Sequence, residues 1–371
     1  QVAFMAPTEI LANQHYQLAK KLFKGTNVNL NILTGKTNYK EKNKILSMLE
    51  NKDINFIFGT HSLFQNKIKF SNLGLIIIDE QHKFGVNQRL KLAKKGGKNC
   101  DLLLMSATPI PRTMMLSFFG DMDISRLKEK PKNRHEILTL VKPERKIDEI
   151  WPLLKNEISM DRQIFWICPL IDESTTLNYS SVKKKFDQIN KIFPSQVGLI
   201  HGNLNKEEKN IILNKFLNKK IKILVSTTVI EVGIDFPDAN TIVIEDSNKF
   251  GLSQLHQLRG RVGRGKNKSV CILLYKNNLS ANAKERLKIL RSTNDGFEIA
   301  EKDLSLRGYG DILGFQQSGI KNFKFADPIH HKDLFFLAEK NIKKIESENL
   351  KKYENLLKLY DRAEIIHEVG N

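Results

Sequence analysis

The strongest constraint on the fold is an alternation of short apolar runs with amphipathic stretches, which occurs twice along the chain. Strands covered on both faces of a parallel sheet are continuously apolar, and the helices that connect them are amphipathic. The alternation therefore predicts two successive α/β domains, each built on a parallel sheet. The expected strands lie at 2–6, 30–33, 55–59, 75–79 and 102–106 in the first domain, and at 138–141, 164–168, 197–200, 223–226, 241–245 and 270–275 in the second.

Helical periodicity separates these strands and continues beyond the last of them. Helices are expected at 9–23, 40–49 and 112–119, and a polar, basic segment at 126–136 is interpreted as an interdomain linker. Beyond residue 276 the pattern predicts helices at 281–291 and 296–306, a loop marked by four glycines between 308 and 319, and a lysine-rich helical tail at 332–360. The predicted organisation is a first lobe at 1–130, a second lobe at 131–276 and a helical region at 277–371.

The charge of the chain favours a polyanionic partner. Lys and Arg outnumber Asp and Glu by 60 to 41, which gives a formal net charge of +19. Neutralising phosphates releases counterions, so this surplus indicates nucleic acid. Compositional drift in an AT-rich genome explains the lysines equally well, because the chain contains 47 Lys and only 13 Arg.

Composition also indicates the cellular compartment. The longest apolar run is far shorter than the ~20 residues of a membrane-spanning helix. The three cysteines, Cys100, Cys168 and Cys271, are too few for a disulfide framework and fit a reducing compartment. A cytoplasmic protein without membrane contact is expected.

Two adjacent acids, Asp79 and Glu80, directly follow the most apolar strand of the first domain. In an open α/β sheet the carboxyl ends of the strands face the ligand crevice. Asp79 is therefore placed to hold Mg²⁺ through its water shell, and Glu80 to orient or deprotonate the water that attacks a γ-phosphate. The alternative is a pair of solvated acids that cap the next helix.

Ser106 and Thr108 follow the next strand, where their hydroxyl groups are placed to relay contacts between a phosphate site and the neighbouring lobe. Helix capping is an ordinary alternative for such residues. In the second domain Thr228 is placed to donate to a nucleic acid phosphate, and Gly233 and Asp235 to meet the nucleotide sugar or nearby arginines. An ordinary strand-to-turn connection explains these three equally well.

Three arginines and no lysine occur at 259–264, although Lys outnumbers Arg more than three to one overall. Arg presents a planar fork of donors, whereas Lys is a point charge, so the fork geometry is expected to be required here. An arginine finger on a transferring phosphoryl group has this requirement. The alternative is a basic loop that binds a nucleic acid backbone.

Together these residues resemble the motifs of superfamily 2 helicases, and within them the RecG family of bacterial ATP-dependent DNA helicases. The segments that carry the resemblance are Gly59 to Gln65, Asp79 to Val86, Ser106 to Thr113, Thr227 to Asp235 and Leu255 to Gly265. The resemblance implies an α/β fold of two RecA-like parallel-sheet lobes followed by a helical hairpin translocation motif. It implies ATP and Mg²⁺ as cofactors, and branched or forked duplex DNA as the partner of a bacterial cytoplasmic monomer. A single-stranded DNA-binding protein is a further expected partner.

The resemblance also implies a role for each matching position. The implied catalytic residues are Asp79, Glu80, Arg261 and Arg264, and the implied nucleotide contacts are Asp79, Gln257, Gly233 and Asp235. DNA contacts are implied for Pro7, Thr8, Thr60, His61 and Thr228. Coupling of hydrolysis to translocation is implied for His82, Ser106, Thr108, Arg286, Arg307 and Gln317.

The chain departs from the family in two features. It contains no Gly-x-x-x-x-Gly-Lys-[Ser/Thr] phosphate loop, and no counterpart of the N-terminal wedge domain of the family. The expectation is a carboxyl-terminal portion whose first lobe is truncated at its N-terminus and which alone does not hydrolyse ATP. The expected activity of the parent protein is fork regression and Holliday junction branch migration in recombination and repair.

Two other functions are compatible with parts of the sequence. A transcription-repair coupling translocase shares the translocation motif, but Gln81 and His82 argue against it. A basic DNA-binding protein without ATPase activity, derived from such a helicase, is suggested by the missing phosphate loop.

Overall fold

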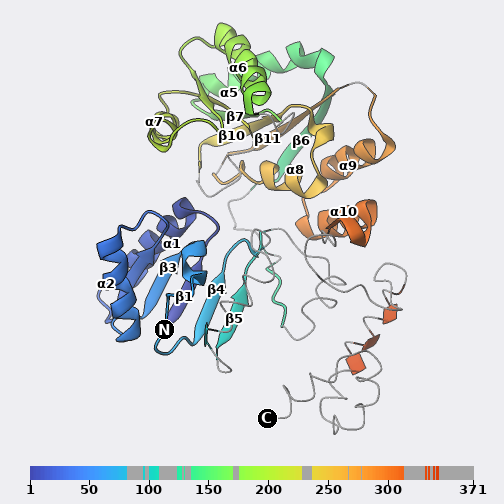
Figure 1. Cartoon of the computed structure of the whole chain (residues 1–371). Coiled ribbons are helices and arrows are strands. Elements are labelled where there is room, and N and C mark those ends of the chain that lie inside the picture. The colour runs from blue at the N-terminus through green and yellow to red at the C-terminus, as the bar shows by residue number, and fades with distance from the viewer. Residues whose placement is uncertain are drawn as a thin grey trace. The chain divides into compact units, whose positions relative to one another are not determined.

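The computed structural model describes residues 1–81, 95–96, 100–107, 123–127, 129, 135–169, 175–227, 236–265, 267–276, 278–312, 331, 333–334, 337–338 and 340–341. The chain forms two compact units, Gln1–Pro109 with Glu129–Ile299, and Ile110–Lys128 with Ala300–Asn371. The first unit contains two parallel sheets, each with its own helices, as Figure 1 shows. Among the described residues no helix is long and apolar enough to cross a membrane.

The first sheet has the strand order β2-β3-β1-β4-β5, and its neighbouring strands are parallel. Its strands are β1 (Val2–Met5), β2 (Leu30–Leu33), β3 (Phe56–Gly59), β4 (Leu75–Ile78) and β5 (Asp101–Leu104). The helices are α1 (Glu9–Leu22), α2 (Tyr39–Glu50) and the 3₁₀ turn η1 (His61–Phe64). All five strands expected from the sequence are confirmed, with ends that shift by one or two residues.

Helices cover both faces of this sheet, because the strands bury side chains alternately on each side. In β1, Ala3 and Met5 belong to the core cluster that contains Ile45 and Leu49 of α2. Phe4 belongs instead to the cluster that contains Ala12 and Ala19 of α1. The continuously apolar strand thus follows from burial on both faces, as predicted.

The second sheet has the strand order β6-β11-β10-β7-β9-β8 and is also parallel. Its strands are β6 (Ile137–Pro143), β7 (Gln163–Ile167), β8 (Val197–Ile200), β9 (Ile223–Ser226), β10 (Ala239–Ile244) and β11 (Ser269–Tyr275). The helices are η3 (Glu144–Ile150), α5 (Trp151–Ser159), α6 (Thr175–Ile192), α7 (Lys206–Leu217), η5 (Ser247–Lys249), α8 (Leu252–Arg259) and α9 (Ala281–Ser292). The six expected strands of this domain are confirmed.

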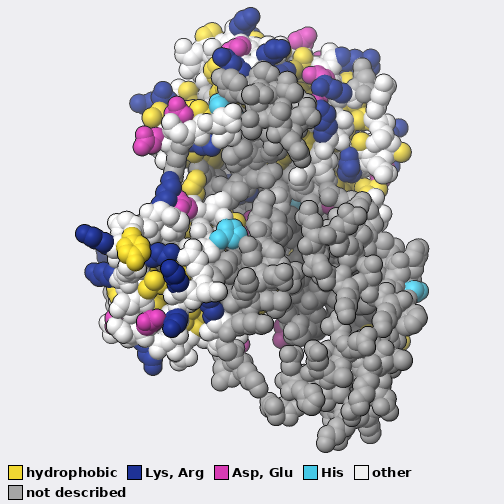
Figure 2. All heavy atoms as spheres, viewed as in Figure 1, with side chains coloured by type: hydrophobic (Ala, Val, Ile, Leu, Met, Phe, Trp, Pro, Cys, Tyr) yellow, Lys and Arg dark blue, Asp and Glu magenta, His cyan; other side chains and the backbone are white. Residues whose placement is uncertain are grey.

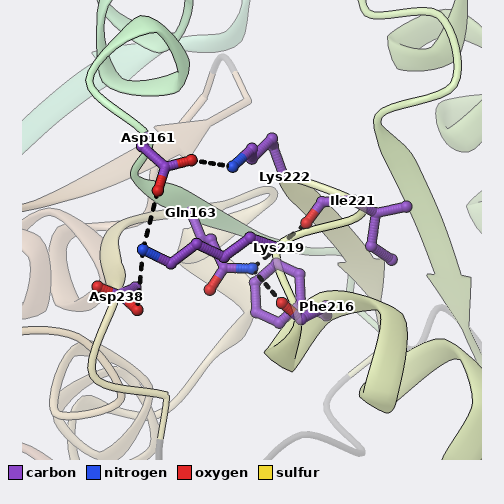
Figure 3. Close-up of polar contacts among 7 residues, drawn as sticks. All are labelled: Asp161, Gln163, Phe216, Lys219, Ile221, Lys222 and Asp238. Carbon is purple, nitrogen blue, oxygen red and sulfur yellow. Dashed lines mark hydrogen bonds and ion pairs between the residues drawn. The ribbon is translucent and has the colours of Figure 1, made fainter.

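A buried glutamine and an exposed ion-pair network hold the amino-terminal edge of the second sheet together (Figure 3). The Gln163 side chain donates from Nε2 to the carbonyls of Phe216 and Ile221. These bonds join the start of β7 to the end of α7 and to the segment before β9. Lys219 Nζ lies 3.0 Å from Asp161 and 3.1 Å from Asp238. The hydrogen bonds to Asp161 and Asp238 raise the pKa of Lys219, and hydrogen bonds from Lys222 and Lys219 lower the pKa of Asp161. These contacts all lie at the amino-terminal edge of the sheet and therefore leave its carboxyl-terminal edge uncovered by this network.

The helical region differs from the prediction in one respect. Helix α10 (Gly296–Ile312) continues through Gly308 and Gly310, which were expected to lie in a loop. An interior glycine costs a helix only about 1 kcal/mol relative to Ala, so two glycines need not end it. The expected helix at 112–119, and most of the segments at 126–136 and 332–360, lie outside the described residues.

Positive charge is spread over the described surface. On the face drawn in Figure 2, Lys and Arg side chains are scattered over both domains, and acidic side chains lie among them. This distribution agrees with compositional drift as the source of many of the lysines.

Candidate functional site

The candidate site in the first domain lies along the carboxyl-terminal edge of its sheet, where four strands end in register. Met5 pairs with both Gly59 and Ile78, and Ile78 pairs with Leu104. The residues that follow these strands therefore share one edge. They include six positions singled out in the sequence: Pro7, Thr8, Thr60, Asp79, Glu80 and Ser106.

Backbone hydrogen bonds continue beyond the strands and fix this edge. The Ala6 N–H donates to the Gly59 carbonyl at 2.9 Å, and the Asp79 N–H to the Met5 carbonyl at 2.9 Å. On the other side, the Gln81 N–H donates to the Met105 carbonyl at 3.0 Å. The two acids are thus held between the ends of β1 and β5.

Both carboxylate oxygens of Asp79 are engaged. Oδ1 accepts a hydrogen bond from the Glu80 backbone N–H at 2.9 Å. Oδ2 lies 3.0 Å from Nε2 of His15, a residue of α1 that is 64 positions away in the sequence. His15 could not be selected from the sequence, because a histidine within an amphipathic helix has no distinguishing pattern.

Glu80 has a left-handed backbone with φ of +49°. A non-glycine residue in this region is uncommon, and such strain costs on the order of 1–3 kcal/mol. The hydrogen bonds of the Glu80 and Gln81 N–H groups hold the turn on either side of the strained residue. Six other described non-glycine residues also have a positive φ, so the conformation is compatible with a chemical role for Glu80 but does not by itself indicate one.

Two of the positions expected to contact DNA, Thr8 and Thr60, lie at the starts of helical segments in the first domain. Thr8 is the N-cap of α1, and its Oγ1 accepts from the Leu11 N–H at 3.4 Å. Thr60 is buried and immediately precedes η1, whose first residue, His61, is exposed. The backbone packs closely here, since a Cβ on Gly59 would lie 2.6 Å from the Leu33 carbonyl oxygen.

In the second domain the arginine-rich segment begins at the end of α8. Arg259 is only 2% exposed. Its Nη1 donates to the carbonyls of Leu290 at 2.6 Å and Thr293 at 2.9 Å, at the end of α9. Nη1 also lies 3.3 Å from the Thr139 hydroxyl, and Nη2 lies 3.2 Å from His256 Nδ1.

The arginine-finger interpretation is therefore wrong for Arg259. Its guanidinium caps the carboxyl terminus of α9, where a positive charge is favoured by the helix dipole. Burial lowers the pKa of this group from its ordinary value. The acceptors of this guanidinium are two backbone carbonyls, and both are bound by Nη1.

Arg261 and Arg264 lie differently. Arg261 is half-buried, whereas Arg264 is exposed and its Nε donates to the Gly260 carbonyl at 3.4 Å. Between them Gly263 has φ of +77°, and a Cβ there would lie 3.1 Å from Ile137 Cγ1. The glycine permits a tight turn that directs Arg264 away from the domain core. Gln257, on α8, is half-buried.

Two residues with an expected coupling role lie on the helices after the second sheet. Arg286 Nη2 donates to the Asn248 carbonyl at 2.9 Å, which ties α9 to the turn before α8. Arg307 lies on α10. The remaining expected positions lie outside the described residues: His82, Thr108, Thr228, Gly233, Asp235 and Gln317.

Replacing Arg259 with Met should destabilise the second domain. The Leu290 carbonyl, whose contact is buried, and the partly buried Thr293 carbonyl would lose their donor. A buried acceptor left unsatisfied costs ~1–3 kcal/mol and a partly buried one less, so the free energy of unfolding should fall by about 2–4 kcal/mol. Urea denaturation followed by the fluorescence of Trp151 and Trp166, both in this domain, measures the change. Arg291→Met, at an exposed position of α9, is the control, and equal midpoints for the two variants would contradict the capping role.

Three family models match consecutive parts of the chain. They describe a DEAD/DEAH box helicase at residues 1–116, a helicase conserved C-terminal domain at 145–266, and domain 3, C-terminal, of the ATP-dependent DNA helicase RecG at 293–358. The first range includes all five strands of the first sheet, and the second includes β7, β8, β9 and β10 of the second sheet.

Curated relatives extend the match over nearly the whole chain. The ATP-dependent DNA helicase RecG of Thermotoga maritima is 44% identical over 358 residues, which are 96% of this chain and 46% of the relative. The RecG of Bacillus subtilis is 45% identical over 332 residues, covering 89% of this chain and 48% of the relative. The chain thus spans less than half the length of these relatives.

Solved structures agree with the sequence comparisons. A structure of RecG bound to a three-way DNA junction superposes with a TM-score of 0.69 at 42% identity, covering 90% of this chain and 43% of that one. Yeast Dbp5 bound to RNA and ADP BeF3 has a TM-score of 0.56 at 16% identity, covering 83% of this chain and 80% of that one. The second likeness concerns the fold alone.

Proposed function

Because the chain belongs to the RecG family of superfamily 2 helicases, we propose that the protein couples ATP hydrolysis to the remodelling of branched DNA, by fork regression and branch migration. The observation that carries the proposal is the in-register edge of the first sheet, where Asp79 and a strained Glu80 follow a buried strand. The 42% identity to a RecG bound to a three-way junction supports branched DNA as the substrate.

The residues at this edge fit a magnesium ion. Mg²⁺ prefers oxygen ligands, keeps several waters, and is commonly bound through one or two carboxylates together with substrate phosphates. Asp79 supplies such a carboxylate, and the described residues contain no cluster of three or more His, Cys, Asp or Glu that would form a closed cage. When bound, the ion neutralises charge on the phosphate oxygens. Asp79 would hold it through water.

We assign the remaining chemistry to side chains at the ends of the strands and after α8. Glu80 orients the attacking water and accepts its proton, while Arg261 and Arg264 stabilise charge on the transferring phosphoryl group. Gln257, Gly233 and Asp235 contact the nucleotide. Arg264 is exposed, which supports this assignment.

DNA contacts are proposed for the segments that follow β1 and β3, and for one residue of the second domain. Pro7, Thr8, Thr60, His61 and Thr228 would bind phosphates, which positions the strand without reading its sequence. Residues proposed to couple hydrolysis to movement are His82, Ser106, Thr108, Arg286, Arg307 and Gln317. The functional domains would be 1–130, 131–276 and 277–371. The protein would act as a cytoplasmic monomer with a single-stranded DNA-binding protein as a further partner.

The test measures hydrolysis and remodelling by the full-length protein on matched DNA substrates. ATPase activity should be stimulated more by a three-way junction than by linear duplex of equal length, and a labelled model fork should be converted to a four-way junction and released arms. Lys155→Met, at an exposed position of α5 in the second domain, is the control variant. Equal stimulation by both DNAs without fork conversion would exclude the proposed function.

A further inference from the structure

We propose that His15 is a positioning residue that holds the Asp79 carboxylate in the orientation needed to bind the metal. The proposal rests on the proposed function, because it concerns the same acid. It starts from the 3.0 Å contact between His15 Nε2 and Asp79 Oδ2, which joins α1 to the end of β4.

The acceptor character of a carboxylate determines which ring nitrogen of His15 carries the hydrogen. An ionised carboxylate only accepts hydrogen bonds, so Nε2 carries the hydrogen in this contact and Nδ1 is left as the acceptor when the ring is neutral. Oδ1 accepts from the Glu80 N–H at 2.9 Å. Asp79 therefore has one donor on each oxygen, and rotating its carboxylate would break at least one hydrogen bond.

His15 can hold the carboxylate because it is itself held. Its ring packs against Phe4 of β1 with centroids 4.5 Å apart and an interplanar angle of 41°. The neighbouring Tyr16 contacts Phe58 of β3 with ring centroids 5.9 Å apart, and Ala12 and Ala19 of the same helix are buried. The helix is thus anchored on the sheet before and after His15.

The side chains of this pair are accessible to a ligand. His15 is 30% exposed and Asp79 is 20% exposed, so the pair lies at the rim of the sheet and not in its core. At the rim, the bond orients a carboxylate that still faces solvent, as donors to metal-binding carboxylates do.

The test compares two substitutions in the full-length protein. His15→Phe keeps a ring against Phe4 but has no donor, whereas His15→Gln restores an N–H group. Mn²⁺ binding in the presence of ADP, followed by electron paramagnetic resonance, should weaken about 10-fold or more for His15→Phe, because removing an outer-shell donor typically costs metal affinity 10–100-fold. His15→Gln should recover most of that loss, and the Mg²⁺ concentration for half-maximal ATPase should shift in parallel.

Controls separate this proposal from the function on which it depends. Gln14→Leu, at the neighbouring exposed position of α1, should bind Mn²⁺ like the wild type, and thermal melting should show that all variants are folded. Wild-type affinity in His15→Phe would overturn the role of His15 while leaving the helicase function standing. Equal losses in the Phe and Gln variants would also overturn it, and failure of the wild type to bind Mn²⁺ with ADP would overturn both.

Discussion

Glu80→Gln is expected to lower the DNA-stimulated ATPase rate of the full-length protein by about 10²–10⁴-fold, the usual contribution of a general base. An amide matches the size of the carboxylate but cannot accept the proton of the attacking water. Nucleotide binding should persist, because Asp79 and its hydrogen bonds are unchanged. Single-turnover hydrolysis and the affinity for a fluorescent ADP measure the two effects separately.

The control for this prediction is Glu50→Gln at the exposed end of α2. It makes the same chemical change on the side of the sheet where the strands begin, away from their carboxyl ends. Its hydrolysis rate should equal that of the wild type. If Glu80→Gln retained more than a tenth of the wild-type rate, Glu80 would not be the base. A rate loss accompanied by an equal loss of nucleotide affinity would point instead to collapse of the strained turn.

Arg264→Met is expected to reduce the hydrolysis rate by about 10³–10⁵-fold, as loss of an arginine finger does. The side chain is exposed, so the free energy of unfolding should change by no more than ~0.5 kcal/mol. Steady-state ATPase with saturating junction DNA and urea denaturation measure the two quantities. The result would be the reverse of that for Arg259→Met, whose main effect is on stability.

A lysine at position 264 tests whether catalysis needs the planar guanidinium or only a positive charge. Arg264→Lys keeps one positive charge but loses the planar fork, and it should recover little of the activity. Near-complete recovery would show that a simple positive charge is sufficient. Full activity in Arg264→Met would remove this residue from the catalytic group and leave Arg261 as the candidate.

The strands were predictable because burial on both faces imposes an apolar run, as in Leu75–Ile78. The adjacency of the motif residues was also predictable, because parallel strands end at a common edge. The contact of His15 with Asp79 was not, since it depends on how α1 packs against a strand end that lies 64 positions further along the chain. The strained backbone of Glu80 was equally hidden, because a glutamate gives no sign that it will adopt a positive φ.

Glycine and arginine show where composition misleads. Gly308 and Gly310 were interpreted as a loop, yet both lie within α10, because the modest cost of glycine is overridden by its context. The scarcity of arginine drew attention to 259–264. Arginine scarcity could not distinguish the exposed guanidinium of Arg264 from that of Arg259, which is buried against backbone carbonyls.

The cap formed by Arg259 has a consequence for the order in which the second domain opens. Separating α9 from α8 would strand a buried guanidinium without the Leu290 and Thr293 carbonyls, and a buried charge without partners is very costly. The last turn of α9 and the end of α8 should therefore open together as one cooperative unit. In native-state hydrogen exchange, their amides should share a single opening free energy, even though the two helices are separate in sequence.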